Sequence, residues 1–297
     1  NRVTARTTEQ MHAEADSLDA RPLIEVAAIL GEGQIAASEV TRNALNSICD
    51  GARAMAEAIR AGGVLRYAAA GSSGLMAASD ALELYGTFSI PASQIRIHMA
   101  GGLPEGVEMP GDVEDHTESL AREFDGMTKD DVVIAVSASG TTPYTVTAAK
   151  SARAVGASVI GIANNGETDL LTLADHAILL ATPPEVVAGS TRLGAGTAQK
   201  IALNMLSTLM AFELGHVYDG MMVNLRADNS KLRDRALRIV SRAAKVTLEE
   251  AAAALRLSGG DVKCAILMAA GAATPEHALT LLDASVGHLR PALANLT

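Results

Sequence analysis

Residues 132–144 read VVIAVSASGTTPY, and this stretch decides the fold class. Residues 132–136 are all apolar, which is typical of a strand buried on both faces of a parallel sheet. The hydroxyl-rich loop that follows ends in Thr142-Pro143, a residue pair suited to the N-cap and first position of a helix. The stretch therefore predicts a strand, a turn and a helix in succession, the repeating unit of α/β proteins.

The same pattern recurs on both sides of this stretch. Apolar runs predict further strands at 64–71, 95–100, 158–165 and 176–182. Helical spacing of apolar residues predicts helices at 33–60, 75–86, 112–125, 143–156 and 197–214. Because these strands alternate with helices, we expect an α/β fold with a five-stranded parallel sheet flanked by helices.

The pattern changes near residue 230, where the strands stop. Short helical stretches follow, each ended by Gly or opened by Pro, and they predict a small C-terminal helical domain. We therefore divide the chain into an N-terminal helical segment (1–60) packed on the main domain, an α/β domain (61–228) and a C-terminal helical domain (229–297).

Composition excludes several classes of function. The chain has 24 Lys and Arg against 34 Asp and Glu, a net charge of −10, and only 2% aromatic residues. An acidic chain without a basic run argues against binding to nucleic acid or to anionic membranes. The N-terminal residues lack the apolar run of a signal peptide, and no apolar stretch is long enough to span a membrane. We expect a soluble, cytoplasmic protein.

Cysteine and histidine usage argues against a metal site or a disulfide framework. Cys49 and Cys264 lie far apart in apolar, helix-like stretches, which favours packing roles for both. The seven histidines are scattered without ligand spacing, and the glycine-rich nucleotide motifs are absent. We therefore expect neither a metal nor an organic cofactor.

Two hydroxyl-rich loops each follow a predicted strand and precede a predicted helix. One is Gly71-Ser72-Ser73-Gly74, and the other contains Ser137, Ser139 and Thr142. Amide groups at a helix N-terminus favour an anion, and hydroxyl groups add neutral hydrogen-bond donors. Caps and turns alone would also explain either loop. Two such loops at neighbouring strand ends favour a phosphate site formed by Ser72, Ser73, Ser137, Ser139 and Thr142.

Three glutamates are candidates for acid–base chemistry or ligand binding. Glu83 follows Leu82 in an apolar stretch of a predicted helix, and desolvation there would suit a general acid. Glu114 lies at the start of the predicted helix 112–125. A negative charge there stabilises the helix N-terminus, which is a simpler explanation for this residue than a catalytic role. Glu185 follows Pro183-Pro184 and precedes two apolar residues, and its role is open.

Three segments resemble a known family: SASGTTPY (137–144), PPEVVAGSTRLGAGTAQK (183–200) and NMLSTLM (204–210). They are very similar to the N-acetylmuramic acid 6-phosphate etherases of the sugar isomerase (SIS) superfamily, and the resemblance runs from about Thr8-Glu9 to residue 268. It implies an SIS-type sheet, a small UBA-like C-terminal helical domain and a homodimer. It also implies a cofactor-independent lyase of cell-wall recycling that releases D-lactate from N-acetylmuramic acid 6-phosphate by elimination and hydration, leaving N-acetylglucosamine 6-phosphate.

The resemblance also implies roles for individual residues. Glu83, in the motif Asp-Ala-x-Glu, and Glu114, in the motif Glu-Asp, match the family's acid and base, with Glu83 serving the leaving oxygen. Glu185, Arg192 and Lys200 lie in the matched segment 183–200 and are expected to contact the substrate.

Three cations usual in the family are replaced by Leu75, Thr141 and Gly194, and residues 84–87 read LYGT where the family has CPPT. An etherase substrate carries a lactyl carboxylate as well as a phosphate, and cations would bind this second anion. Their loss therefore leaves two alternatives to the etherase activity open. The chain could act as a lyase or isomerase on a different amino-sugar phosphate, or it could be a sugar-phosphate sensor without catalysis.

The spacing of Ser72 and Glu83 predicts an active site shared between two subunits. Eleven residues along one helix correspond to about 16 Å, too far for one hexose phosphate to reach both. A two-fold homodimer would bring Glu83 of one subunit to the site of the other, twice.

Overall fold

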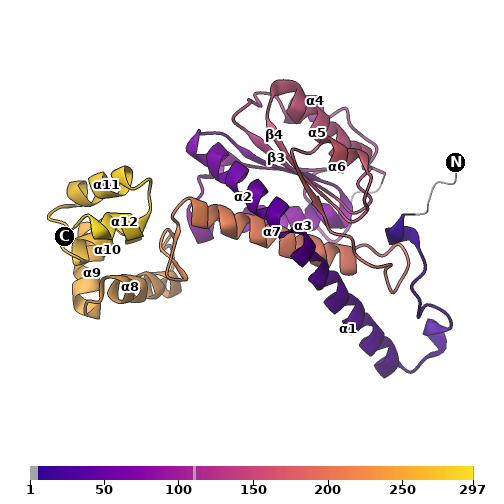
Figure 1. Cartoon of the computed structure of the whole chain (residues 1–297), viewed down its shortest axis with the longest axis horizontal. Helices are drawn as coiled ribbons and strands as arrows, with labels where there is room; N and C mark the ends of the chain where they lie inside the picture. Colours follow the sequence, from indigo (N-terminus) through magenta and orange to yellow (C-terminus); the bar gives the residue numbers. More distant parts are fainter. Residues whose placement is uncertain (1–5, 110–111, 297) are drawn as a thin grey trace. The chain divides into compact units, whose positions relative to one another are not determined.

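The computed structural model describes residues 6–109 and 112–296; residues 1–5 of the predicted N-terminal segment lie outside the described part, as do 110, 111 and 297. A parallel sheet of five strands confirms the predicted fold class (Figure 1). The strands are β1 (Leu65–Ala69), β2 (Ile95–Met99), β3 (Val132–Ser137), β4 (Ser158–Ala163) and β5 (His176–Leu179), each within a stretch predicted to contain a strand.

The order of the strands across the sheet is β2-β1-β3-β4-β5. The chain therefore leaves β1 in one direction to form β2 and returns to the other side of β1 to form β3. Loops that follow β1 and β3 diverge at this reversal and leave a crevice beyond the carboxyl ends of the two strands. The two hydroxyl-rich loops follow these two strands, so the topology brings them together.

Helices cover both faces of the sheet (Figure 1). One face carries α2 (Leu45–Arg60), α3 (Gly71–Phe88) and α7 (Gly194–Glu213), and the other carries α4 (Leu120–Glu123), α5 (Pro143–Val155) and α6 (Asp169–Leu173). Nearly all residues of the central strands β1, β3 and β4 are buried on both faces; Ile134 and Val133 alternate between them with no exposed surface. This explains why the strands read as continuous apolar runs rather than as an alternating pattern.

The single helix predicted at 33–60 is wrong. The structure has α1 (Leu23–Glu39), a 3-10 segment (Val40–Ala44) and then α2. At the break, Ser38 Oγ donates to the carbonyl of Ile35 at 2.6 Å, and Thr41 Oγ1 donates to the carbonyl of Ser38 at 2.9 Å. Hydroxyl groups that bond to the backbone in this way compete with regular helix hydrogen bonds.

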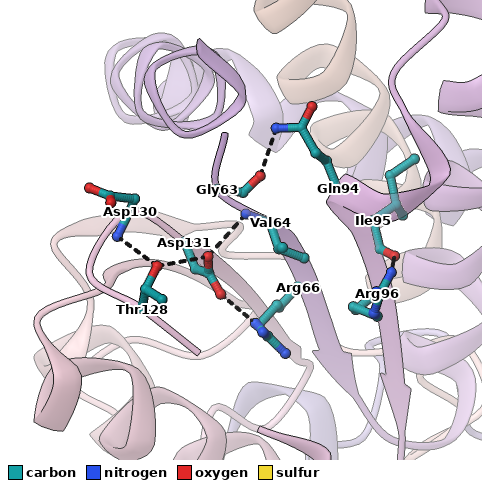
Figure 2. A network of polar contacts seen from close by, with 9 residues as sticks. All are labelled: Gly63, Val64, Arg66, Gln94, Ile95, Arg96, Thr128, Asp130 and Asp131. Atoms are coloured by element: carbon teal, nitrogen blue, oxygen red, sulfur yellow. Dashed lines mark hydrogen bonds and ion pairs between the residues drawn. The ribbon is translucent and has the colours of Figure 1, made fainter. Parts of the chain in front are cut away.

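A buried ion pair ties together the amino ends of β1 and β3 (Figure 2). Arg66 Nε donates to Asp131 Oδ2 at 2.7 Å, and both side chains are less than 10% exposed. The other carboxylate oxygen, Oδ1, accepts a hydrogen bond from the amide of Val64 at 3.1 Å and one from the hydroxyl of Thr128 at 3.3 Å. The carboxylate therefore holds a strand end and the loop before β3 at the edge of the sheet opposite the crevice.

The chain forms two compact units, residues 1–82 with 93–207 and residues 83–92 with 208–297. The second unit contains a short hairpin, β6 (Val217–Tyr218) and β7 (Met221–Met222). It also contains α8 (Ser230–Ala244), α9 (Leu248–Leu257), α10 (Val262–Ala269), α11 (Pro275–Ala284) and α12 (Leu289–Ala294). This confirms the helical C-terminal region. In the described part of the chain, no helix is long and apolar enough to cross a membrane.

Candidate functional site

A polar cavity of about 180 Å³ lies at the carboxyl ends of β1 and β3, within the first unit. We call it the hydroxyl pocket, because most of its polar lining side chains carry hydroxyl groups. It contains all five predicted phosphate ligands and one of the two predicted acid–base glutamates. Its lining residues are Thr8, Glu9, Ala70, Ser72, Ser73, Glu114, Val136, Ser137, Ala138, Ser139, Thr142, Gly189 and Thr191.

Three hydroxyl groups at the end of β3 form a cluster. Ser137 Oγ lies 2.9 Å from Thr142 Oγ1 and 3.2 Å from Ser139 Oγ. Thr142 occupies the N-cap position of α5, but its side chain makes no capping hydrogen bond and joins this cluster instead. The cluster therefore presents hydroxyl groups next to a helix N-terminus, where the partial positive charge of the helix favours an anion.

The glycine between these hydroxyl residues cannot be replaced without moving its surroundings. Gly140 has φ +71°, and a Cβ on it would lie 2.6 Å from Cβ of Thr168. The loop can therefore pass close to the residues before α6 only because position 140 has no side chain.

The second hydroxyl loop forms the first turn of α3. Ser72 and Ser73 lie in the first three residues of the helix, where amide groups have no partner within the helix. Gly71 precedes them with φ +53°, and a Cβ there would lie 3.0 Å from Glu114 Oε1. The carboxylate of Glu114 therefore lies directly beside the start of α3.

Glu114 does not open a helix, so the helix predicted at 112–125 is wrong over most of its length. Only α4 (Leu120–Glu123) is helical in that range, and Asp112 has φ +52°, in the left-handed region. The carbonyl of Glu114 instead accepts a hydrogen bond from the amide of Tyr144 at 3.0 Å. A tertiary contact with the first turn of α5 thus replaces the local helix and places Glu114 at the pocket.

The side chain of Tyr144 holds the same segment at its far end. Its hydroxyl donates to Glu123 Oε2 at 2.6 Å, and that oxygen lies 3.3 Å from His98 Nδ1. Burial lowers the pKa of His98 to about 4 despite the opposing charge of Glu123, so the imidazole is neutral near pH 7. The segment 114–123 is therefore anchored at both ends by one buried tyrosine.

A buried carboxylate connects β1, α3 and α7. Asp80 accepts hydrogen bonds from the hydroxyl of Tyr67 at 2.9 Å, the side-chain amide of Asn204 at 2.8 Å and the hydroxyl of Ser207 at 2.8 Å. Burial raises the pKa of Asp80, while these hydrogen bonds and the charge of Lys200 oppose the rise. The Asp80 carboxylate thus fixes the helix that begins with Ser72 and Ser73 against the sheet.

The other predicted site residues lie outside the lining of the hydroxyl pocket. Glu83 is exposed on α3, so the apolar burial expected for it is not found in the single chain. Glu185 is buried, and its carboxylate accepts hydrogen bonds from the amides of Gly194 and Ala195, both at 2.9 Å, at the start of α7. Arg192 and Lys200 are exposed. Their predicted contacts with substrate remain predictions.

Besides three apolar residues near the ends of β1 and β3, sequence reasoning missed Thr8, Glu9, Gly189 and Thr191 of the pocket. A threonine next to a glutamate near the N-terminus was the available signal for the first two. The other two lie in the loop between β5 and α7, one and three residues before the predicted Arg192. None of these four residues ends or directly follows β1 or β3, and the phosphate site was predicted only from residues that end or directly follow these strands.

The pocket is lined by two carboxylates, and among the described lining residues none is Lys, Arg or His. Hydroxyl groups and helix amides are therefore its anion-binding groups. Across residues 6–109 and 112–296, no group of three or more His, Cys, Asp or Glu side chains could hold a metal ion.

Known proteins share both the sequence and the fold. Residues 103–213 match the family model of the SIS domain. An N-acetylmuramic acid 6-phosphate etherase of Streptomyces avermitilis is 40% identical, with 97% of this chain and 93% of the relative covered. One of Deinococcus radiodurans is also 40% identical, with 97% and 95% covered. The structure of an Escherichia coli CFT073 protein in complex with A5P has a TM-score of 0.52 at 16% identity, with 67% of this chain and 94% of that chain covered, which shows a shared fold.

Proposed function

The chain belongs to the N-acetylmuramic acid 6-phosphate etherase family, and we propose that it cleaves the D-lactyl ether of N-acetylmuramic acid 6-phosphate. The products are N-acetylglucosamine 6-phosphate and D-lactate. The observation that carries this proposal is the placement of Glu114 beside a neutral phosphate cradle in one pocket.

The reaction needs a base and an acid. The base takes the proton at C2 of the sugar, the bond between C3 and the ether oxygen breaks, and the acid protonates the departing lactate oxygen. Water then adds across the C2–C3 double bond, with its hydroxyl on C3 and a proton returned to C2, so that the net change is hydrolysis of the ether. Two carboxylates in different environments can fill both roles.

We assign the base to Glu114 and the acid to Glu83. Glu114 lines the hydroxyl pocket and lies beside Gly71, so a sugar whose phosphate rests on the hydroxyl groups has its ring near this carboxylate. Ser72, Ser73, Ser137, Ser139 and Thr142 hold the phosphate through hydroxyl groups and through the N-termini of α3 and α5. Phosphorylated sugars are metabolites of the cytoplasm, and we place the enzyme there.

The proposed activity predicts release of D-lactate. Incubation of the purified chain with N-acetylmuramic acid 6-phosphate should yield D-lactate and N-acetylglucosamine 6-phosphate in equal amounts, measured by a lactate dehydrogenase assay and by chromatography. N-acetylmuramic acid without the phosphate should react far more slowly, because the hydroxyl pocket then has no anion to hold. Binding of the phosphosugar without any lactate release would instead support the sensor.

We further propose that the active site is shared between the subunits of a homodimer. α3 runs unbroken from Gly71 to Phe88, so Ser72 and Glu83 are about 16 Å apart along its axis. Glu83 is also exposed and absent from the lining of the hydroxyl pocket. A two-fold partner would supply this carboxylate reciprocally.

A mixture of two inactive variants tests the shared site. Glu83→Gln homodimers should be at least about 10²-fold slower than the unaltered enzyme, because they lack the acid. Ser139→Ala homodimers should also be slower, because they lack one phosphate ligand. Heterodimers of the two variants would contain one intact site and should recover close to half of the activity. Confirmed heterodimers that remain inactive would place both groups within one subunit.

A further inference from the structure

The turn that precedes Glu9 is built into the carboxyl edge of the sheet. Thr8 is 1% exposed; its hydroxyl accepts a hydrogen bond from Asn165 Nδ2 at 3.1 Å, and its carbonyl accepts one from the amide of Gly189 at 3.2 Å. Asn165, which follows β4, also donates to the carbonyl of Ala138 at 2.9 Å. Thr8 is therefore held by the loops that follow β4 and β5, and Asn165 links it to the loop after β3. These contacts fix the backbone just before Glu9.

Glu9 and Glu114 approach the hydroxyl pocket from different sides. Glu114 lies beside Gly71, which follows β1, whereas Glu9 Oε2 lies 3.7 Å from the position that a Cβ on Gly189 would take. The hydroxyl cluster after β3 lies between the two, since β3 is between β1 and β4 in the sheet. A ligand with its phosphate on this cluster thus has a carboxylate on either side.

The charge of Glu9 determines what it can contact. A carboxylate accepts hydrogen bonds and repels a phosphate, so Glu9 faces a part of the ligand that donates hydrogen bonds and carries no negative charge. A ring hydroxyl of a sugar meets both conditions. When a ligand covers the pocket and excludes water from it, the carboxylate needs such a donor.

We infer that Glu9 is a substrate-binding residue whose carboxylate accepts hydrogen bonds from the hydroxyl groups of the sugar ring. This inference rests on the proposed function, which supplies the sugar phosphate as ligand. Glu9 orients the ring: its negative charge keeps the phosphate on the hydroxyl cluster and keeps uncharged, hydrogen-bond-donating groups on the side of β4. Glu9 therefore contributes to binding of the sugar ring and not to binding of the phosphate.

Calorimetric titration with a phosphosugar and with inorganic phosphate separates binding of the sugar ring from binding of the phosphate. With N-acetylglucosamine 6-phosphate, Glu9→Gln should raise Kd about 10-fold or more, as expected for loss of hydrogen bonds to a charged acceptor. With inorganic phosphate, the same variant should bind as tightly as the unaltered chain or more tightly, because a repelling charge is gone. Ser139→Ala should weaken binding of both probes, and Glu25→Gln, an exposed glutamate on α1, should change neither.

Two results would overturn the role of Glu9. One is an unchanged Kd of Glu9→Gln for the phosphosugar, and the other is an equal loss of affinity for both probes, which would indicate a general effect on the pocket. In either case, lactate release by the unaltered chain would leave the proposed function in place. Failure of the unaltered chain to bind the phosphosugar would overturn both.

Discussion

Glu114→Gln is expected to lower kcat at least about 10²-fold, within the range that a positioned general base contributes. Glutamine keeps the size of the side chain but cannot take the proton at C2. The backbone hydrogen bond from Tyr144 to residue 114 does not depend on the side chain, so the segment should stay in place. Rates of D-lactate release at saturating substrate measure the effect.

Binding distinguishes a catalytic role of Glu114 from a structural one. The hydroxyl cluster is unchanged in Glu114→Gln, so Kd for N-acetylglucosamine 6-phosphate should stay within a few fold of that of the unaltered chain. Glu118→Gln changes another exposed glutamate of the same segment, outside the hydroxyl pocket, and should have the full rate. If Glu114→Gln keeps near-normal turnover, another group is the base.

Asp131→Ala is expected to lower the free energy of unfolding by about 3–5 kcal/mol, because it leaves the guanidinium of Arg66 buried without its partner. The amide of Val64 also loses its acceptor. Urea unfolding followed by far-UV circular dichroism measures the loss.

A surface pair of the same two residue types provides the control. Arg53 and Asp50 are also 2.7 Å apart, but each side chain is 56% exposed, whereas Arg66 and Asp131 are 7% and 3% exposed. Asp50→Ala should therefore change stability by no more than about 1 kcal/mol. Equal effects of the two substitutions would mean that burial does not determine the contribution of the Arg66 pair.

Short-range patterns were enough to predict the strands and the two hydroxyl-rich loops that line one pocket. A strand buried on both faces, such as 132–137, is almost entirely apolar, so a few consecutive residues are enough to predict its position. The hydroxyl residues after β1 and β3 are close in sequence to these strands, and parallel strands place their carboxyl ends at one edge. Ser72 and Ser139 therefore lie in one pocket, as predicted.

The conformation around Glu114 was beyond such patterns. The charged and apolar residues of 112–125 have helical spacing, but the amide of Tyr144, thirty residues along the chain, binds the carbonyl of Glu114 and holds the segment in an open turn. This tertiary hydrogen bond competes with a local helical preference of only tenths of a kcal/mol per residue, about the scale of helix propensities. Asp112, with a left-handed backbone, does not have a helical conformation.

The sequence by itself determined the order of strands and helices along this chain and the residues that could hold a phosphate, because both depend on neighbours in the chain. Only the tertiary structure decided which residues from distant parts of the chain line the same pocket. Thr8 and Glu9 reach the pocket through contacts with Asn165 and Gly189, more than 150 residues away, and Glu83 is absent from the pocket lining. Such contacts depend on how buried polar groups far apart in sequence find hydrogen-bond partners in the folded chain, and no local pattern records that pairing.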